Sequence, residues 1–271
     1  MNFKNSKAGL SVALFVSLAL TSTHPASASV CYTSGKVYVQ QKVYDKAVYF
    51  LECARKGEPE NVDVLSLLAF ARAQQRQYKS AGAAFQLALE AAKKKKDEKK
   101  VQDIERNRLS VNALLFNAGV KALSGSQGAE PPTEATLPPY APPSDAQSAV
   151  TDTTVFPAFT GASRLEEAAY DFVLASYVDP SSIETYQNLT YVLSGLGRTD
   201  DAILAARTGL KLKPDDQRLL QNLRAAVMGK AVKLYNDGKY EESIVEFRQA
   251  MSRIPSPARR LATSFGSRAP G

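Results

Sequence analysis

A spacing of 34 residues recurs along this chain and constrains its fold more than any other feature. Ala168 and Ala202 are 34 positions apart, and so are Pro180 and Pro214. A fixed period of this length is typical of folds in which one helical hairpin stacks on the next. The period therefore predicts an extended array of paired helices.

Small side chains recur at one place in the repeated unit, and aromatic side chains recur at another. Small residues let the two helices of a hairpin approach closely, whereas an aromatic ring fills the space between neighbouring hairpins. One hairpin cannot bury its own apolar face, so each unit depends on its neighbours. A generic amphipathic bundle is the alternative. The small residues are Gly35, Gly119, Ala47, Ala81, Ala168 and Ala202, and the aromatic ones are Phe85, Phe172 and Phe247.

The units resemble tetratricopeptide repeats, in which a second helix carries Ala-x-x-x-Phe-x-x-Ala before a proline. No single unit is complete, but five of them agree in register. The resemblance implies an all-α fold, a right-handed superhelix (α-solenoid) of about five helical hairpins, with the third hairpin split by a Pro-rich insertion. The matching positions are Ala47, Leu51, Ala54 and Pro59; Ala81, Phe85 and Ala88; Ala168, Phe172, Ala175 and Pro180; Ala202, Ala206 and Pro214; and Ser243, Phe247, Ala250 and Pro255.

The first 28 residues have the composition of a secretory signal peptide. Lys4 and Lys7 form a basic start, an uncharged apolar run covers residues 8–20, and Ala26-Ser27-Ala28 is a small-x-small cleavage site. We expect cleavage after the last of these and export to the periplasm or the secreted space. The apolar run is too short for a membrane anchor, so no transmembrane segment is expected in the mature chain. A lipid-anchored form on Cys31 is the alternative.

Cys31 and Cys53 are the only cysteines. Cys31 is expected near the start of the first helix and Cys53 near the end of its antiparallel partner, so the hairpin brings them together. Because disulfides persist in exported proteins, we predict a bond between them. It would stabilise the terminal hairpin by about 3 kcal/mol in the chain-entropy model. Two free thiols are the alternative.

Interruptions of the period define the expected organisation of the chain. The third unit starts near residue 112 rather than 96, which leaves 16 extra residues without Gly or Pro. These are expected to lengthen the helices on either side by about two turns each. The predicted segments are a signal peptide at 1–28, repeats one and two at 29–95, an extended helix into repeat three at 96–124, an acidic Pro-rich flexible insertion at 125–163, the second helix of repeat three with repeats four and five at 164–255, and a basic disordered tail at 256–271.

The insertion separates the two helices of the third hairpin. Seven of the 14 prolines lie between Ser124 and Ser163, in a stretch without Lys or Arg. Such a composition is not expected to form a packed core and predicts a flexible, partly polyproline loop. One hypothesis is that this insertion, which is acidic and has an aromatic end at residues 150–159, lies in the groove of the solenoid until a partner displaces it.

The mature sequence lacks the residue patterns of catalysis. His24 is the only histidine and leaves with the signal peptide, which excludes Ser-His and Cys-His arrangements and histidine-based zinc sites. There is no Gly-rich phosphate loop with its lysine and no Asp-x-Asp cluster. We therefore expect no catalytic residue, no metal, no cofactor and no nucleic-acid partner, in a protein that is not an enzyme.

In the tetratricopeptide family the first helices line a concave groove, so the resemblance implies that certain first-helix positions contact a ligand. In this sequence those positions carry mostly aromatic and apolar side chains, which suit an apolar extended or helical peptide. Core packing is the alternative for any one of them. The chain is thus expected to be a scaffold for a partner protein or peptide. The predicted groove residues are Tyr32, Lys36, Phe70, Phe116, Val120, Tyr191 and Tyr235, with Ser66, Gln187, Met228 and Val232 beside them.

A dense charge cluster supports a second hypothesis. The segment Lys93–Lys100 contains six lysines, and the tail after Pro255 is basic. These regions would attach a structural envelope protein electrostatically to anionic wall polymer or lipid, and the attachment would weaken with salt. A solvated helical elbow is the simpler interpretation of the lysines.

Overall fold

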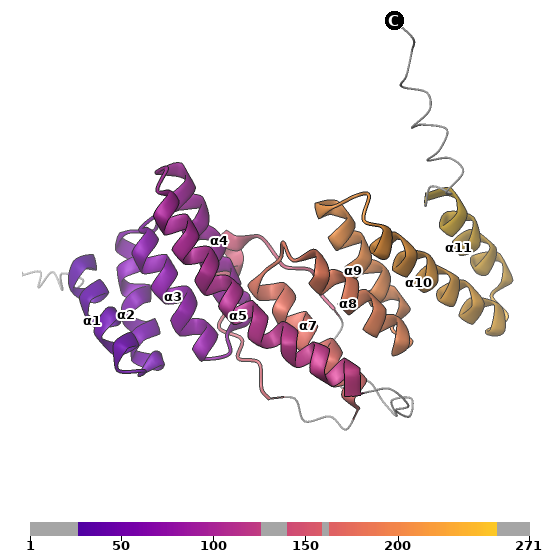
Figure 1. The fold of residues 1–271 in the computed structure, drawn as a ribbon, viewed down its shortest axis with the longest axis horizontal. Helices are drawn as coiled ribbons and strands as arrows, with labels where there is room; N and C mark the ends of the chain where they lie inside the picture. The colour runs from indigo at the N-terminus through magenta and orange to yellow at the C-terminus, as the bar shows by residue number, and fades with distance from the viewer. Residues whose placement is uncertain (1–26, 126–139, 159–162, 254–271) are drawn as a thin grey trace, which may run out of the picture.

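The computed structural model describes residues 27–125, 140–158 and 163–253. Eleven helices and no strand occur in this part of the chain (Figure 1). Residues 1–26 and 254–271, on which most of the predicted signal peptide and all of the tail fall, lie outside it. None of the described helices combines the length and apolar character that crossing a bilayer requires. In chain order the helices are α1 Ala28–Gln40, α2 Tyr44–Gly57, α3 Val62–Gln74, α4 Tyr78–Lys94, α5 Glu98–Gly125, α6 Ala146–Ala149, α7 Arg164–Val178, α8 Ile183–Gly195, α9 Thr199–Leu212, α10 Gln217–Asn236 and α11 Tyr240–Arg253.

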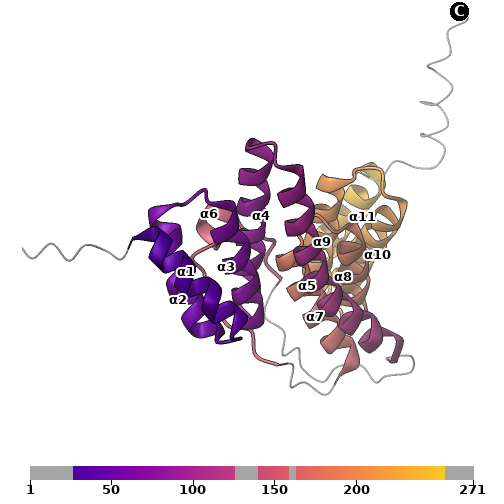
Figure 2. The ribbon, with the colours of Figure 1, turned by 60° about the vertical axis from the view of Figure 1, so that its left-hand side comes forward.

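The helices pair into five antiparallel hairpins that stand in a row, as Figures 1 and 2 show. α1 pairs with α2, α3 with α4, α5 with α7, α8 with α9, and α10 with α11. The predicted all-α solenoid of tetratricopeptide type is therefore confirmed. The split third hairpin is confirmed as well, because α5 and α7 pack together although the insertion separates them in sequence.

Within the hairpins, one residue in the left-handed backbone region closes each tight turn. In four hairpins this residue is Lys42 (φ 59°), Arg76 (φ 60°), Gly197 (φ 71°) or Gly238 (φ 74°). The N–H of the following residue then bonds back to a carbonyl of the first helix, which satisfies an acceptor that the helix end leaves open. A side chain other than glycine costs about 1 kcal/mol in this conformation, which the packing of the hairpin offsets.

The same turn geometry ends α4, where Lys96 has a φ of 56°. As a result α4 has only 17 residues, whereas α5 has 28 and α3 has 13. The expectation that the extra residues lengthen both flanking helices by about two turns is therefore wrong, because nearly all of them extend α5. At 1.5 Å per residue α5 is about 42 Å long.

Close packing of the helices depends on the small residues of the period. Ala168 in α7 and Ala202 in α9 are both fully buried. A Cβ atom added at Gly119 would lie 2.9 Å from the ring of Phe172, so a glycine lets this ring fill the third hairpin. Phe247 is only half-buried, because no described hairpin follows α11 to cover it.

Part of the insertion packs onto the solenoid, contrary to expectation. We call residues 140–158 the strap. Its Tyr140 and Val150 side chains are 4% and 1% exposed, and the guanidinium group of buried Arg72 donates to the carbonyl of Val150. The prediction that this composition forms no packed core is therefore wrong for the strap, because single apolar side chains find cover on helices already in place.

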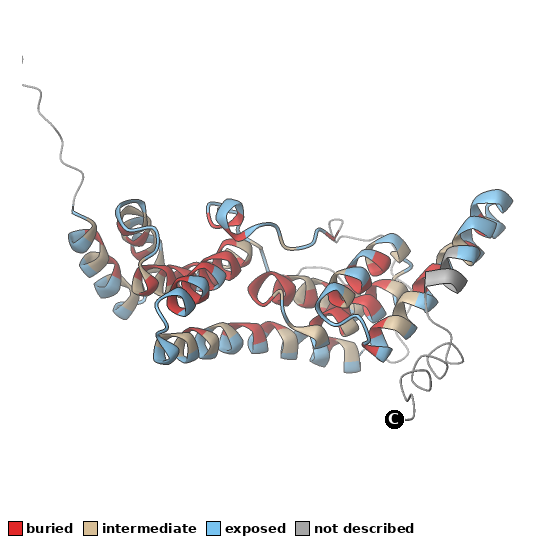
Figure 3. Ribbon diagram, turned by 90° about the horizontal axis from the view of Figure 1, so that it is seen from above, coloured by how far each residue is buried: buried red, intermediate tan, exposed pale blue. Residues whose placement is uncertain are grey.

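Helix α6, in the middle of the strap, lies on the side of the solenoid away from α5 (Figure 3). The strap contacts Arg72 near the end of α3 and Arg76 in the α3–α4 turn, and its helix α6 packs on α4. The hypothesis that the insertion occupies the groove stays a hypothesis. The rest of the insertion, 126–139 and 159–162, lies outside the described residues.

Replacement of Gly82 tests the contact between α4 and α7. A Cβ atom there would lie 1.8 Å from the carbonyl oxygen of Tyr177, so one of the two backbones has to move. We expect Gly82→Ala to lower the free energy of unfolding by about 3 kcal/mol, measured by urea denaturation. Gly229→Ala in α10 is the matched control, because its Cβ meets only Thr199 at 3.7 Å. The control should raise stability by up to about 1 kcal/mol, and a Gly82→Ala chain as stable as the wild type would contradict the packing.

The predicted disulfide is confirmed, since Cys31 and Cys53 are bonded with their Cα atoms 5.8 Å apart. Replacing both by serine should lower the stability of the first hairpin by about 3 kcal/mol, because the unfolded chain regains the freedom that the bond removes. Hydrogen exchange of the α1 and α2 amides measures this effect. A reducing agent should reproduce it in the wild type and leave the double variant unchanged, whereas equal protection in all three samples would rule out a stabilising bond.

Candidate interaction site

The first helices of the hairpins, α1, α3, α5, α8 and α10, form one layer of the solenoid (Figure 1). Within this layer α1 packs on α3, α3 on α5, and α8 on α10. The described helices α5 and α8 do not pack to a comparable extent, and an open groove of about 510 Å³ lies between them, which we call the α5–α8 cleft. Its lining residues are Arg108, Leu109, Asn112, Ala113, Phe116 and Asn117 from α5, and Asp179, Ser181, Ser182 and Glu184 from the α7–α8 turn and the start of α8.

A buried ion pair forms the wall between the cleft and the core. Nη1 of Arg108 lies 3.1 Å from Oδ1 of Asp179, and the two side chains are 14% and 5% exposed. Ser181 donates to the same carboxylate oxygen through its N–H and its hydroxyl, at 3.1 and 2.6 Å. Asn112 donates to the carbonyl of Ala175 at 3.0 Å. These bonds fix α5 on the α7–α8 turn and order the polar side of the cleft.

An apolar stripe runs along α5 beside this wall. Leu109, Ala113, Phe116 and Val120 are spaced by four, three and four residues, so they share one face of the helix. Leu109 is 51% exposed and Val120 is 39% exposed, whereas Phe116 is half-buried because its ring packs 5.6 Å from that of Phe172. When two helices pack as a pair, an apolar face with this spacing is covered by the partner helix. None of the helices in the described ranges covers the stripe.

Three of the predicted groove residues lie on the helices that flank the cleft. Phe116 and Val120 belong to the stripe, and Tyr191 on α8 is 57% exposed. Tyr235 lies on α10, where its ring is 5.2 Å from that of Tyr240, and it does not line the cleft. Of the predicted set, the cleft lining includes only Phe116.

The predicted residues of the first two repeats lie away from the cleft. Tyr32 is half-buried in the first hairpin, and this burial raises the pKa of its hydroxyl, with the carboxylate of Asp63 adding to the effect. Phe70 makes an edge contact with Tyr44, with ring centroids 6.1 Å apart. Lys36 is exposed on α1. The seven predicted residues therefore do not share one pocket, and their contact with a ligand stays a prediction.

Polar side chains close the layer between α8 and α10. Nε2 of Gln187 donates to Asp216 at 2.9 Å, and the carbonyl of Gln187 accepts from Asn222 at 3.0 Å. Arg218 donates to Asn188 at 3.0 Å. Gln187, which the family pattern assigns to the groove, therefore takes part in packing between repeats.

Sequence reasoning missed most of the cleft. Arg108 and Leu109 fall among the extra residues before the third repeat, to which the family pattern assigns no role. The four-three-four spacing from Leu109 to Val120 was a signal that could have found the stripe. The separation of α5 from α8 has no such signal, because it depends on how α5 meets the α7–α8 turn.

The lysine-rich elbow between α4 and α5 is partly neutralised. Lys94 lies 3.0 Å from Glu60, and Lys100 pairs with Asp63. The hydrogen bond to Asp63 is the main cause of the raised pKa of Lys100. These pairs tie the elbow to the beginning of α3 and give two of its lysines a structural role.

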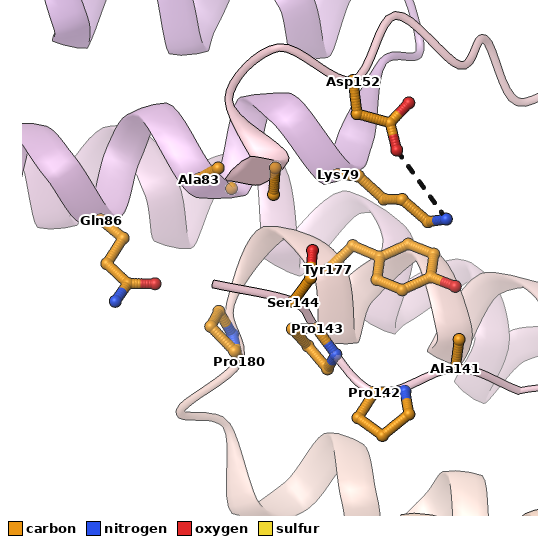
Figure 4. Close-up of a pocket in the computed structure, with 12 residues that line it drawn as sticks. Lys79, Ala83, Gln86, Ala141, Pro142, Pro143, Ser144, Asp152, Tyr177 and Pro180 are labelled. Atoms are coloured by element: carbon orange, nitrogen blue, oxygen red, sulfur yellow. Dashed lines mark ion pairs between the residues drawn. The ribbon is translucent and has the colours of Figure 1, made fainter. Parts of the chain in front are cut away.

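A smaller pocket of about 130 Å³ lies under the strap (Figure 4). Lys79 of α4, Tyr177 of α7 and Asp152 of the strap meet there. Burial raises the pKa of Tyr177 to about 12, so its hydroxyl is protonated at neutral pH. The ammonium group of Lys79 lies 5.1 Å from the centroid of that ring and 3.9 Å from Asp152. The three side chains thus fasten the strap to the second-helix layer.

Comparison with known proteins gives likeness of architecture only. No protein-family model and no curated protein sequence matches the chain. A crystal structure of MamA protein is similar with 15% identity and a TM-score of 0.32, covering 90% of this chain and 97% of that one. The MamA 41-end structure from Desulfovibrio magneticus RS-1 is 13% identical with a TM-score of 0.29, covering 83% of this chain and 94% of that one. TTC0263, a thermophilic TPR protein of Thermus thermophilus, is 18% identical with a TM-score of 0.29, covering 89% of this chain and 98% of that one. At these values the description of the fold rests on the helix packing of this chain itself.

The ion pair in the cleft wall gives a stability prediction. Asp179→Ala should lower the free energy of unfolding by about 3 kcal/mol, because it leaves the guanidinium group of Arg108 buried without its charge partner. Asp103→Ala is the control on the same helix as Arg108, since its pair with Arg106 is largely exposed and should change stability by less than about 1 kcal/mol. Guanidinium chloride denaturation measures both. Similar values for the two variants would show that the wall pair is not the structural tie described above.

Proposed function

We propose that this chain is a non-catalytic interaction scaffold that holds an amphipathic helical segment of a partner protein in the α5–α8 cleft. The observation that carries the proposal is the stripe from Leu109 to Val120, which is apolar, helix-spaced and largely exposed. Burial of such a face is favourable by about 25 cal/mol per Å². Contiguous apolar faces of this kind on protein surfaces mark places where partners bind.

The dimensions and polarity of the cleft support a helical ligand. The rise from Leu109 to Val120 is about 16 Å, which corresponds to three turns of a partner helix. Asn117 and Glu184 line the same cleft, so the polar flanks of such a helix find hydrogen-bond partners at the rim. A partner helix with apolar residues at three- and four-residue spacing fits this surface.

Export to the periplasm or the secreted space is part of the proposal. It is supported by the signal-like sequence of residues 1–28 and by the disulfide of the first hairpin, which suits an oxidising compartment. N-terminal sequencing of the protein from fractionated cells tests it. An uncleaved chain recovered from the cytoplasm would contradict it.

Attachment of an envelope protein to anionic polymer or lipid through Lys93–Lys100 is the alternative function. In its favour, Lys93, Lys95, Lys96 and Lys99 are exposed. Against it, Lys94 and Lys100 are already paired with carboxylates. The salt dependence of binding distinguishes the two functions. An electrostatic attachment weakens steeply with ionic strength, whereas binding of an apolar helix in the cleft is retained.

Charge substitutions in the stripe test the scaffold. Leu109→Glu and Val120→Glu should each reduce recovery of the partner from envelope extract by about tenfold, because a carboxylate buried in an apolar contact costs more than about 1.4 kcal/mol. Crosslinking and mass spectrometry with the mature chain as bait measure the recovery.

Leu114→Glu is the matched control for these variants. Leu114 is on the same helix and is 72% exposed, but it lies about 140° around the axis from Leu109 and about 120° from Val120, outside the stripe. It should recover the partner as well as the wild type. Equal recovery with all three variants would refute the cleft as the binding site.

A further inference from the structure

The last part of the strap, residues 151–158, is held by few side chains. Asp152 and Phe156 are half-buried, while their neighbours are exposed, Val155 at 56% among them. The preceding residue, Val150, is buried. This end of the strap therefore contacts the core through separate anchors, as a bound peptide does.

The backbone of Phe156 and Pro157 is bound at the α3–α4 turn. The N–H of Phe156 donates to the carbonyl of Arg76 at 3.0 Å. In return, Nε of Arg76 donates to the carbonyl of Phe156 at 2.6 Å, and its Nη2 donates to the carbonyl of Pro157 at 2.8 Å. The hydroxyl of Tyr170 donates to the same proline carbonyl at 2.7 Å. Because these bonds use backbone atoms, they hold an extended segment irrespective of most of its side chains.

The ring of Phe156 packs among aromatic side chains. Its centroid lies 6.4 Å from that of Tyr78 and 5.6 Å from that of Tyr177, and both tyrosines are buried. The ammonium group of Lys79 lies 5.8 Å from the Phe156 centroid, within the range of a cation–π interaction. An aliphatic side chain would lose the ring contacts and the cation contact, so this pocket selects an aromatic residue.

Charge and backbone stiffness define the rest of the recognised segment. Lys79 faces Asp152, which precedes Phe156 by four residues (Figure 4). Arg76, which binds the carbonyls of Phe156 and Pro157, adds a second positive charge to the site. Pro157 has no N–H that needs a partner, and its ring favours an extended backbone at the residue before it. The site therefore matches an acidic residue, three spacer residues, an aromatic residue and a proline.

We infer that the pocket formed by the α3–α4 turn, α4 and α7 is a second binding site, which takes an extended partner segment of this acidic-x-x-x-aromatic-proline type. Residues 152–157 of the strap occupy the site and compete with the partner segment. None of the side chains that form this site lines the α5–α8 cleft, so the inference does not depend on the proposed role of that cleft.

Competition by the strap sets the expected affinities. A segment tethered within the same chain has an effective concentration on the order of millimolar. A separate peptide should therefore bind the wild type at least about tenfold more weakly than a chain whose own anchor is removed.

The probe is a fluorescein-labelled peptide with the sequence of residues 150–158, titrated with the full chain and followed by fluorescence anisotropy. Phe156→Ala removes the anchor and leaves the tyrosines of the pocket in place, so this variant should bind the peptide at least about tenfold more tightly than the wild type. A peptide that carries Phe156→Ala should bind neither chain. Adding Leu109→Glu to the Phe156→Ala chain should leave peptide binding unchanged, which separates this test from that of the cleft.

Three results would overturn the inference. The first is absence of binding to the Phe156→Ala chain at about 1 mM peptide while its circular dichroism spectrum stays helical; if that variant does not fold, Phe156→Leu replaces it with the same expectation. The second is equal binding of the peptide without phenylalanine. The third is a concentration-dependent wild-type dimer that Phe156→Ala abolishes, because the occupant would then be the strap of a second copy.

Discussion

The contact between α4 and α7 joins the two halves of the solenoid. The insertion interrupts the third hairpin, and in the second-helix layer the row of hairpins stays continuous because α4 packs on α7. They meet where Gly82 of α4 touches the carbonyl of Tyr177 at the end of α7, a distance that excludes any side chain at position 82. Phe85 and Ala175 beside this point are fully buried. The spacing of the halves therefore depends on a close approach of two backbones.

Both candidate binding sites arise where this packing departs from a regular repeat. On one face, the turn at Lys96 ends α4 early and makes α5 long. α5 then meets the α7–α8 turn through the Arg108–Asp179 pair instead of packing on α8, which opens the cleft. On the other face, the join of α4 and α7 exposes aromatic and basic side chains that the strap covers.

The two faces also differ in the chemistry that they offer to a partner. The cleft presents an apolar stripe with polar rims, which suits a helix whose backbone hydrogen bonds are already satisfied internally. The pocket that holds Phe156, formed by the α3–α4 turn, α4 and α7, instead binds the backbone of its ligand. Arg76 and Tyr170 supply hydrogen-bond donors and the carbonyl of Arg76 supplies an acceptor, which suits an extended segment. A regular repeat would bury both surfaces between neighbouring hairpins, so the irregularities of this chain are its informative features.

Features that depend on local period and register could be predicted from the sequence. The 34-residue spacing of Ala168 and Ala202 predicted stacked hairpins and a split third hairpin, and the positions of Cys31 and Cys53 predicted their bond, because each follows from where residues fall on adjacent helices. Composition failed for the strap, since it averages over a segment, whereas one buried side chain such as Val150 needs only a single gap in a folded surface. The α5–α8 cleft and the pocket that holds Phe156 could not be predicted in this way. Their residues are far apart in the chain, and their meeting depends on how helices cross, which no local pattern encodes.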